Sequence, residues 1–237
     1  MIEELQKIID ESNNIVFFGG AGVSTESGLK DFRGKNGLYK AQNKYNRSPE
    51  YLLSNRCLYN EPEIFFEYYK ENLNSEDIKP NITHKYLKEL EDKSKLKAIV
   101  TQNIDGLHQK AGSKHVLEVH GTTYRCYCDK CYKEYPGDKI FKSSGIPKCE
   151  CGGMIRPAVT LYGEQLPEAF DEAIYYISKA DVLIVAGTSL TVEPASSLVR
   201  LFNGKHLIII NDAPTPYDSI AELVIHKPLG EVFSKLK

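Results

Sequence analysis

The chain has 237 residues, of which 41% are hydrophobic and 26% charged, a composition typical of a soluble globular domain with room for a small insertion. The formal net charge of −2, without a large basic block, argues against a nucleic-acid-binding protein. No apolar run approaches the roughly 20 residues that span a bilayer, and the acidic, amphipathic start MIEELQKIIDESNN is no signal peptide, so we expect a cytoplasmic protein without membrane contact.

A helix is predicted over residues 2–11, and a strand buried on both faces over residues 15–18. The strand runs directly into Gly19, Gly20, Ala21 and Gly22. Such a strand and glycine-rich turn lets backbone N–H groups approach a pyrophosphate. The spacing is not the usual G-x-G-x-x-G, because the next glycine is Gly28, so a plain strand-to-helix turn is the alternative.

Residues 34–75 predict a helical insertion, with helices near 49–55 and 62–73. The second helix carries four consecutive or near-consecutive aromatic residues: Phe65, Phe66, Tyr68 and Tyr69. Their spacing favours core packing over a binding face. A further helix is expected over residues 84–91.

Polar side chains follow two expected strands in residues 97–121. The apolar run 98–100 ends at Gln102, Asn103 and Asp105, and the run 116–119 ends at His120. Ligands bind beyond the carboxyl ends of strands in open α/β sheets, so both groups are candidates for chemistry. The alternative is that Asn103 and Asp105 form a turn and His120 is an ordinary loop histidine.

The C-terminal part alternates strands with helices. Sheet patterning is expected to resume at 158–162, and strands at 181–186, 206–210 and 223–225, with helices over 167–179 and 194–202 between them. This alternation predicts a doubly wound parallel sheet of the α/β class. The strand ends Thr188, Ser189 and Asn211 are again polar, which favours a nucleotide pocket over structural turns.

Five of the six cysteines fall within residues 124–156. The pairs Cys128/Cys131 and Cys149/Cys151 supply the four thiolates of a tetrahedral zinc site, which would be structural because no coordination position stays open. Redox or free thiols are the alternative, and Cys126 competes as a C-x-C partner of Cys128. Cys57 is expected in the core.

Taken together, the motifs GAGVSTESGLKDFRG, TQNIDGLHQKAG, HG, the four-cysteine module, RPAVTLYGE and GTSLTVEP resemble the sirtuins over essentially the whole chain. Sirtuins are NAD-dependent protein-lysine deacylases. The resemblance implies a Rossmann-like NAD-binding domain (1–33, 76–123 and 157–237) and a small domain made of the helical insertion and a zinc-ribbon module (34–75 and 124–156). An acyl-lysine peptide would enter the cleft between them.

The resemblance also implies roles for individual residues, with His120 as general base and Asn103 holding the developing oxocarbenium ion. The implied NAD contacts are Gly20, Ala21, Gly22, Ser24, Thr25, Asp31, Phe32, Arg33, Gln102, Asn103, Ile104, Asp105, His120, Gly187, Thr188, Ser189, Asn211 and Asp212. The implied substrate contacts are His120, Val159, Thr160, Leu161, Tyr162, Gly163 and Glu164.

The implied reaction consumes NAD and yields nicotinamide, O-acetyl-ADP-ribose and free lysine. Gly19, Leu29-Lys30 and Thr160 depart from the family pattern. No arginine stands three positions beyond any aromatic residue of the 62–73 helix, so we expect neutral rather than acidic acyl groups. The alternatives are a mono-ADP-ribosyltransferase, a hydride-transferring dehydrogenase, which is disfavoured, and a non-enzymatic zinc-ribbon module. We expect a monomer.

Overall fold

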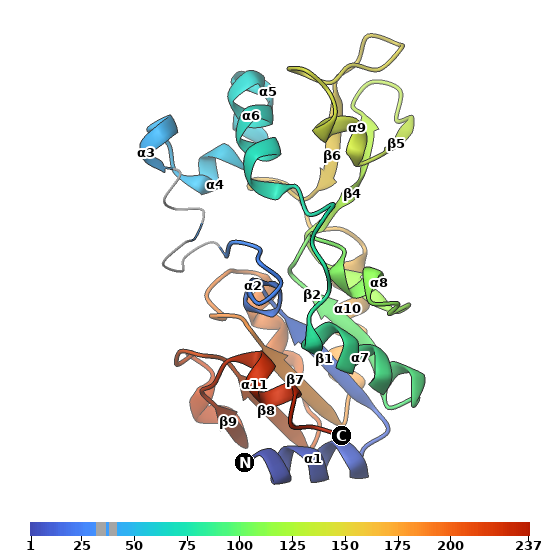
Figure 1. Ribbon diagram of the computed structural model, residues 1–237, viewed down its shortest axis with the longest axis vertical. Helices are drawn as coiled ribbons and strands as arrows, with labels where there is room; N and C mark the ends of the chain where they lie inside the picture. The colour runs from blue at the N-terminus through green and yellow to red at the C-terminus, as the bar shows by residue number, and fades with distance from the viewer. Residues whose placement is uncertain (32–36, 38–41) are drawn as a thin grey trace.

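The computed structural model describes residues 1–31, 37 and 42–237. The expected cofactor residues Phe32 and Arg33 lie outside these ranges. Figure 1 shows two units along the long axis of the molecule, which we call the large and the small unit. The large unit is built on a six-stranded sheet, and the small unit on a three-stranded sheet. Both chain termini lie at the end of the large unit that is remote from the small one.

The strands are β1 (Ile15–Gly19), β2 (Leu96–Thr101), β3 (Val116–Glu118), β4 (Gly121–Cys128), β5 (Glu134–Pro136), β6 (Ile155–Val159), β7 (Val182–Ala186), β8 (His206–Ile210) and β9 (Leu223–Ile225). The α-helices are α1 (Ile2–Glu11), α2 (Gly22–Thr25), α3 (Gln42–Tyr45), α4 (Pro49–Leu52), α5 (Asn55–Asn60), α6 (Pro62–Leu73), α7 (Ile82–Asp92), α8 (Leu107–Lys110), α9 (Asp138–Phe141), α10 (Ala169–Lys179) and α11 (Leu229–Phe233). Two 3₁₀ helices complete the described elements, η2 (Ala195–Leu201) and η3 (Asp218–Ile220).

The large sheet has the strand order β3-β2-β1-β7-β8-β9, and every pairing in it is parallel. Counted along this sheet alone, the order is 3-2-1-4-5-6, the doubly wound Rossmann arrangement. The predicted fold class is therefore confirmed. The chain winds outward from β1 in one direction and from β7 in the other, so a crevice opens beyond the carboxyl ends of these two neighbours.

Alternating side chains of β1 enter two separate cores, one on each face of the sheet. Ile15 and Phe17 pack with α1, α7 and α11, while Val16 and Phe18 pack with α10 and η2. A strand covered on both faces has no polar side, which explains the continuous apolar run at the sequence level. The helix expected over 194–202 is the 3₁₀ helix η2, which follows Pro194, and the short α11 was not expected from the sequence.

The small unit combines the antiparallel sheet β5-β4-β6 with α3–α6 and α9. The four aromatic residues of α6 are buried in its core beside Ile140 of α9, so the core-packing prediction is confirmed. The strand expected at 158–162 is β6 (Ile155–Val159), and it pairs with β4 in this smaller sheet. The expected domain boundaries at 123/124 and 156/157 fall inside β4 and β6, and they stay predictions.

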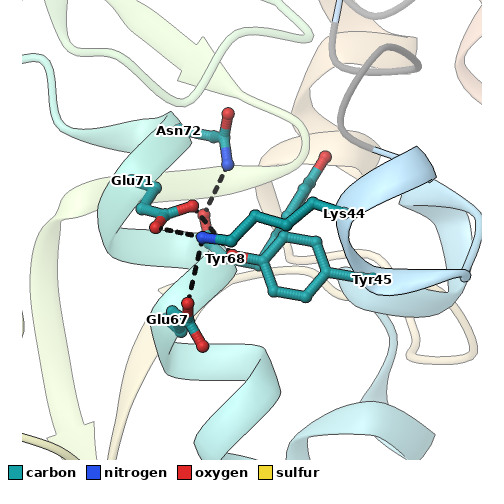
Figure 2. A network of polar contacts seen from close by, with 6 residues as sticks. All are labelled: Lys44, Tyr45, Glu67, Tyr68, Glu71 and Asn72. Atoms are coloured by element: carbon teal, nitrogen blue, oxygen red, sulfur yellow. Dashed lines mark hydrogen bonds and ion pairs between the residues drawn. The ribbon is translucent and has the colours of Figure 1, made fainter.

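Helix α3 is fixed to α6 by the polar network of Figure 2. Lys44 Nζ lies 3.0 Å from Glu67 Oε1 and 2.6 Å from Glu71 Oε1, and Tyr45 donates to Glu71 Oε2 at 2.8 Å. The Tyr45 ring also meets Tyr68 edge-on at 5.6 Å. Because the ion pairs are exposed, each contributes little to stability, and the aromatic contact is the firmer anchor.

Candidate active site

A cavity of about 1020 Å³ lies at the carboxyl ends of the large sheet's central strands. This volume is at the upper end of the roughly 300–1000 Å³ that small-molecule sites occupy. Its walls come from the segments after β1, β2, β7 and β8, together with residues 159–164 from the small unit's β6. All the described residues that the sequence predicted for NAD and substrate line this cavity.

The glycine turns after β1 and β7 touch backbone to backbone. Gly22 N donates to Gly187 O at 2.8 Å, and a Cβ on Gly22 would lie 2.8 Å from Gly187 Cα. A Cβ on Gly20 would lie 2.7 Å from Thr188 Cβ, and Gly187 itself has φ +61°. Close packing of two turns thus requires these glycines, which also keeps the floor of the cavity free of side chains. The irregular glycine spacing therefore fits two requirements, the close packing of the two turns and a cavity floor without side chains.

A buried polar chain links the β1 turn to the β2 end. Asn103 Nδ2 donates to Ser24 Oγ at 3.1 Å, and Ser24 Oγ donates to Asp105 Oδ2 at 2.7 Å. Asp105 Oδ1 also accepts from Leu107 N at 2.9 Å, so this carboxylate stabilises the local turn as well as the polar chain. Burial raises the pKa of Asp105 against the opposing effect of these two hydrogen bonds. The chain fixes the amide of Asn103 at the cavity wall.

His120 lies on the cavity wall, and one of its ring nitrogens contacts a backbone carbonyl. Its Nδ1 lies 3.1 Å from Gln102 O, and because a carbonyl only accepts, Nδ1 must carry the proton. Nε2 then keeps its lone pair for a ligand. Burial lowers the pKa of His120, opposed by the Gln102 carbonyl. The next residue, Gly121, has φ +75°, and a Cβ there would lie 2.2 Å from Ala158 O, which explains the His-Gly pair.

The expected substrate segment 159–164 is held from the small unit's side. Tyr162 N donates to Leu53 O and Asn55 N donates to Tyr162 O. Glu164 accepts from both terminal nitrogens of Arg156, at 2.6 and 2.8 Å, and from Asn55 Nδ2 at 2.8 Å. The carboxylate of Glu164 therefore stabilises the segment. No sequence pattern pointed to Arg156 or Asn55, since nothing in their spacing pairs them with Glu164.

Other cavity-lining residues were also missed. They come from the end of α6 and from the loops near η2 and α11: Asn72, Leu73, Ser75, Val192, Glu193, Pro194, Lys227, Pro228 and Leu229. They follow no motif, because their place at the cavity depends on how loops from distant parts of the chain converge. The only sequence signal is that each lies at or near the end of a helix.

The four cysteines predicted as metal ligands form one cluster. Their Sγ atoms lie within 4.8 Å of one another, with 3.4 Å between Cys128 and Cys151 and 3.7 Å between Cys131 and Cys149. Tetrahedral Zn–S bonds of ~2.3 Å place sulfurs about 3.8 Å apart, so the donor set fits zinc. None of the four lines the cavity, which agrees with a structural metal.

Tyr135 and Cys126 are near this cluster, but only Tyr135 contacts one of its four cysteines. The Tyr135 hydroxyl lies 3.0 Å from Cys149 Sγ, and this hydrogen bond leads the effects that lower the pKa of Cys149 to about 6. Cys126 Sγ instead points to Pro136 O at 3.2 Å and is not part of the cluster. The competing Cys126–Cys128 pairing is therefore wrong. Cys57 is buried in the small unit's core, as expected.

The fold and the site define a Rossmann-type nucleotide-binding protein with a tetrathiolate module. Residues 20–194 match the family described as the Sir2 family. The chain belongs to this family. It is 52% identical to an NAD-dependent protein deacetylase of Clostridium acetobutylicum, with 98% of this chain and 96% of the relative covered. It is 51% identical to one of Clostridium perfringens, with 99% and 98% covered.

Solved structures of Sir2 proteins are similar to this chain over nearly its whole length. A Sir2 variant with a deacetylated p53 peptide and 3′-O-acetyl ADP-ribose superposes with a TM-score of 0.90 at 38% identity, covering 98% of this chain and 96% of that one. A Sir2 complex with a p53 peptide and NAD⁺ gives a TM-score of 0.87 at 38% identity, covering 99% and 96%. Among the described residues, no helix is long and apolar enough to cross a membrane.

Proposed function

We propose that this protein removes acetyl or other neutral acyl groups from protein lysines, consuming NAD and one water molecule and releasing nicotinamide, O-acetyl-ADP-ribose and free lysine. The observation that carries the proposal is that His120, whose Nδ1 contacts the Gln102 carbonyl, and the Asn103–Ser24–Asp105 chain line one cavity. Relatives about 50% identical over nearly their whole length are NAD-dependent protein deacetylases.

The glycine turns and the polar strand ends would hold NAD along the cavity floor. Gly20, Gly22 and Gly187 leave the backbone open to close approach, and Thr188, Ser189 and Asn211 lie at the ends of β7 and β8, where we assign the adenosine half. NAD supplies an electrophilic ribose carbon, C1′, to the acyl oxygen once nicotinamide leaves. The remaining roles fall to side chains of this protein.

Asn103 is assigned to the reacting end of the site. Its Nδ2 is committed to Ser24, so the amide dipole is fixed before a ligand binds. Groups that are oriented in advance stabilise developing charge without the cost of reorganisation. We therefore assign Asn103 to orienting and stabilising the ribose as positive charge develops at C1′.

His120 would accept a proton from a ribose hydroxyl at Nε2, so that the sugar oxygen attacks the acyl carbon. Only the neutral imidazole can do this. Because burial lowers its pKa from 6.5, the protonated fraction grows only in more acidic solution. The kcat/KM should therefore be flat at neutral pH and fall as pH drops below about 6.5.

Helix α6 bears on which acyl groups the cavity can accept. This helix reaches the cavity only through its last residues, Asn72 and Leu73, while Phe66 and Tyr69 are fully buried in the core. No arginine lines the described part of the cavity. An acidic acyl group would lack a bidentate partner there, so we propose acetyl and other neutral acyl groups as substrates.

The test is to incubate the protein with NAD and an acetyl-lysine peptide, and to follow nicotinamide and both product masses. We expect turnover on the acetyl peptide, at least tenfold lower kcat/KM on the succinyl peptide, and a loss of about 10²–10⁴-fold in His120→Ala. The matched control is His206→Ala, which removes a half-buried histidine that does not line the cavity.

Two results would contradict the proposal. Nicotinamide release at the full rate without any acyl peptide would favour the alternative, a mono-ADP-ribosyltransferase. Full activity in His120→Ala would remove the general-base assignment. That the protein acts as a cytoplasmic monomer, without binding nucleic acid or membranes, stays a prediction.

A further inference from the structure

Asn81 begins helix α7 and caps it. Its Oδ1 accepts from Thr83 N at 3.0 Å and from His84 N at 3.5 Å, the usual arrangement at a helix N-cap. The His84 ring returns to the Asn81 backbone N at 3.3 Å. These contacts use only the oxygen of the Asn81 side chain.

The nitrogen of the same amide reaches a different part of the chain. Asn81 Nδ2 donates to Val23 O at 2.7 Å and to Ser27 Oγ at 3.0 Å. A primary amide has two N–H groups, so both bonds form at once and the whole side chain is engaged. A helix cap does not require these bonds. They connect α7 to the short helix α2 and the residues that follow it.

Helix α2 also carries part of the active site. Ser24, next to Val23, connects Asn103 to Asp105 in the buried polar chain. A second tether follows at Glu26, whose Oε1 accepts from Gly230 N at 2.9 Å near the start of α11. Both tethers lie before Gly28, which has φ +96°, and the next residues, 29–31, line the cavity.

We propose that Asn81 is a positioning residue for the NAD site: its amide fixes α2, and through Ser24 the Asn103 side chain, in the geometry that binds the nicotinamide ribose. The inference rests on the proposed function and assigns a role to a residue that does not line the cavity. The substrate segment 159–164 is anchored separately by Arg156 and Asn55. Loosening α2 should therefore weaken NAD binding without affecting peptide binding.

Three substitutions separate this tether from the helix cap. Asn81→Asp keeps an equally good N-cap but places a carboxylate oxygen opposite Val23 O. Asn81→Ser keeps a capping hydroxyl and removes both N–H donors. Ser27→Ala removes one of the two acceptors and leaves the cap untouched. Ser48→Ala is the control, because it deletes the side-chain cap of α4 without touching α2.

The main measurement is the Kd for NAD, obtained by calorimetry and independent of turnover, with the KM values for NAD and peptide beside it. We expect the Kd to rise about tenfold or more in Asn81→Asp, about fivefold in Asn81→Ser and two- to threefold in Ser27→Ala. The KM for peptide should stay within twofold, and Ser48→Ala should bind NAD normally.

Wild-type NAD affinity in folded Asn81→Asp and Asn81→Ser would overturn the inference and leave Asn81 a helix cap only. If Asn81→Asp does not fold, wild-type NAD affinity in both Asn81→Ser and Ser27→Ala would overturn the inference. Equal losses for NAD and peptide would also overturn it, because they indicate general loosening. A wild-type protein that binds NAD but deacetylates nothing would contradict the proposed function, while the NAD affinities would still test Asn81.

Discussion

The cysteines and the histidines of this protein lie in different parts of the structure. All six cysteines lie within residues 42–73 or 121–159, which hold α3–α6, β4–β6 and α9 of the small unit. All six histidines lie outside these two ranges. Two of these histidines, His84 and His108, are buried, with ring centroids 4.7 Å apart.

This division reflects how each unit forms a core. The large unit buries two apolar layers against a six-stranded sheet and needs no metal. The small unit has a three-stranded sheet and a core rich in aromatic rings. Small folds of this kind commonly depend on a bound metal. Metal removal and acid should therefore act on different units.

The largest effect is expected from removing zinc. Structural zinc contributes about 10–16 kcal/mol in zinc-finger peptides, far more than a three-stranded sheet supplies by itself. Cys149→Ser or a strong chelator should unfold residues 124–156 while the large sheet stays protected, as read by segment-resolved hydrogen exchange. Cys126→Ala is the control, since Cys126 lies outside the cluster, and it should keep one zinc per chain. Protection of 124–156 in metal-free protein would contradict the assignment.

Acid should destabilise the large unit by a smaller amount. Burial lowers the pKa of His84 from 6.5 to about 4 and that of His108 well below 6.5. Between pH 6.5 and pH 4 the unfolded chain binds more protons than the folded one. The contribution of these histidines to the free energy of unfolding is therefore fully present above pH 6.5, and it is lost as the pH drops toward 4. The shift of His84 corresponds to about 3 kcal/mol by pH 4.

Urea unfolding as a function of pH measures this loss. A free energy of unfolding that is constant between pH 6.5 and 4.5 would show that the buried histidines are not the acid-sensitive groups. Metal loss in acid is followed separately by zinc content.

The smallest effect concerns the aromatic core of the small unit. The Tyr69 hydroxyl is buried and has no hydrogen-bond partner among the described residues, and its ring stacks on Phe65 and Phe141. Tyr69→Phe removes an uncompensated polar atom and keeps the stacking, so stability should change by less than about 1 kcal/mol, toward a gain. A loss of 2 kcal/mol or more, measured by urea unfolding, would reveal a partner for this hydroxyl.

Periodicity and local chemistry predicted most elements of the fold. Helix α1, strand β8 and strand β9 have the predicted bounds, because each is a clean apolar pattern next to a turn. The strand near 158–162 was misplaced, because pattern alone does not say which sheet a strand joins. Only its pairing with β4 assigns it to the small unit.

The sequence by itself determined the residue types of the site, since the polar strand ends, the glycine turns and the paired cysteines are each local patterns. The tertiary structure decided which atoms meet. The proton on His120 Nδ1 follows from the Gln102 carbonyl, and the tether of Asn81 to Val23 joins positions 58 residues apart. Such contacts depend on the pairing of β2 with β3 and on the packing of α7 against the large sheet, and no periodicity in the chain encodes them.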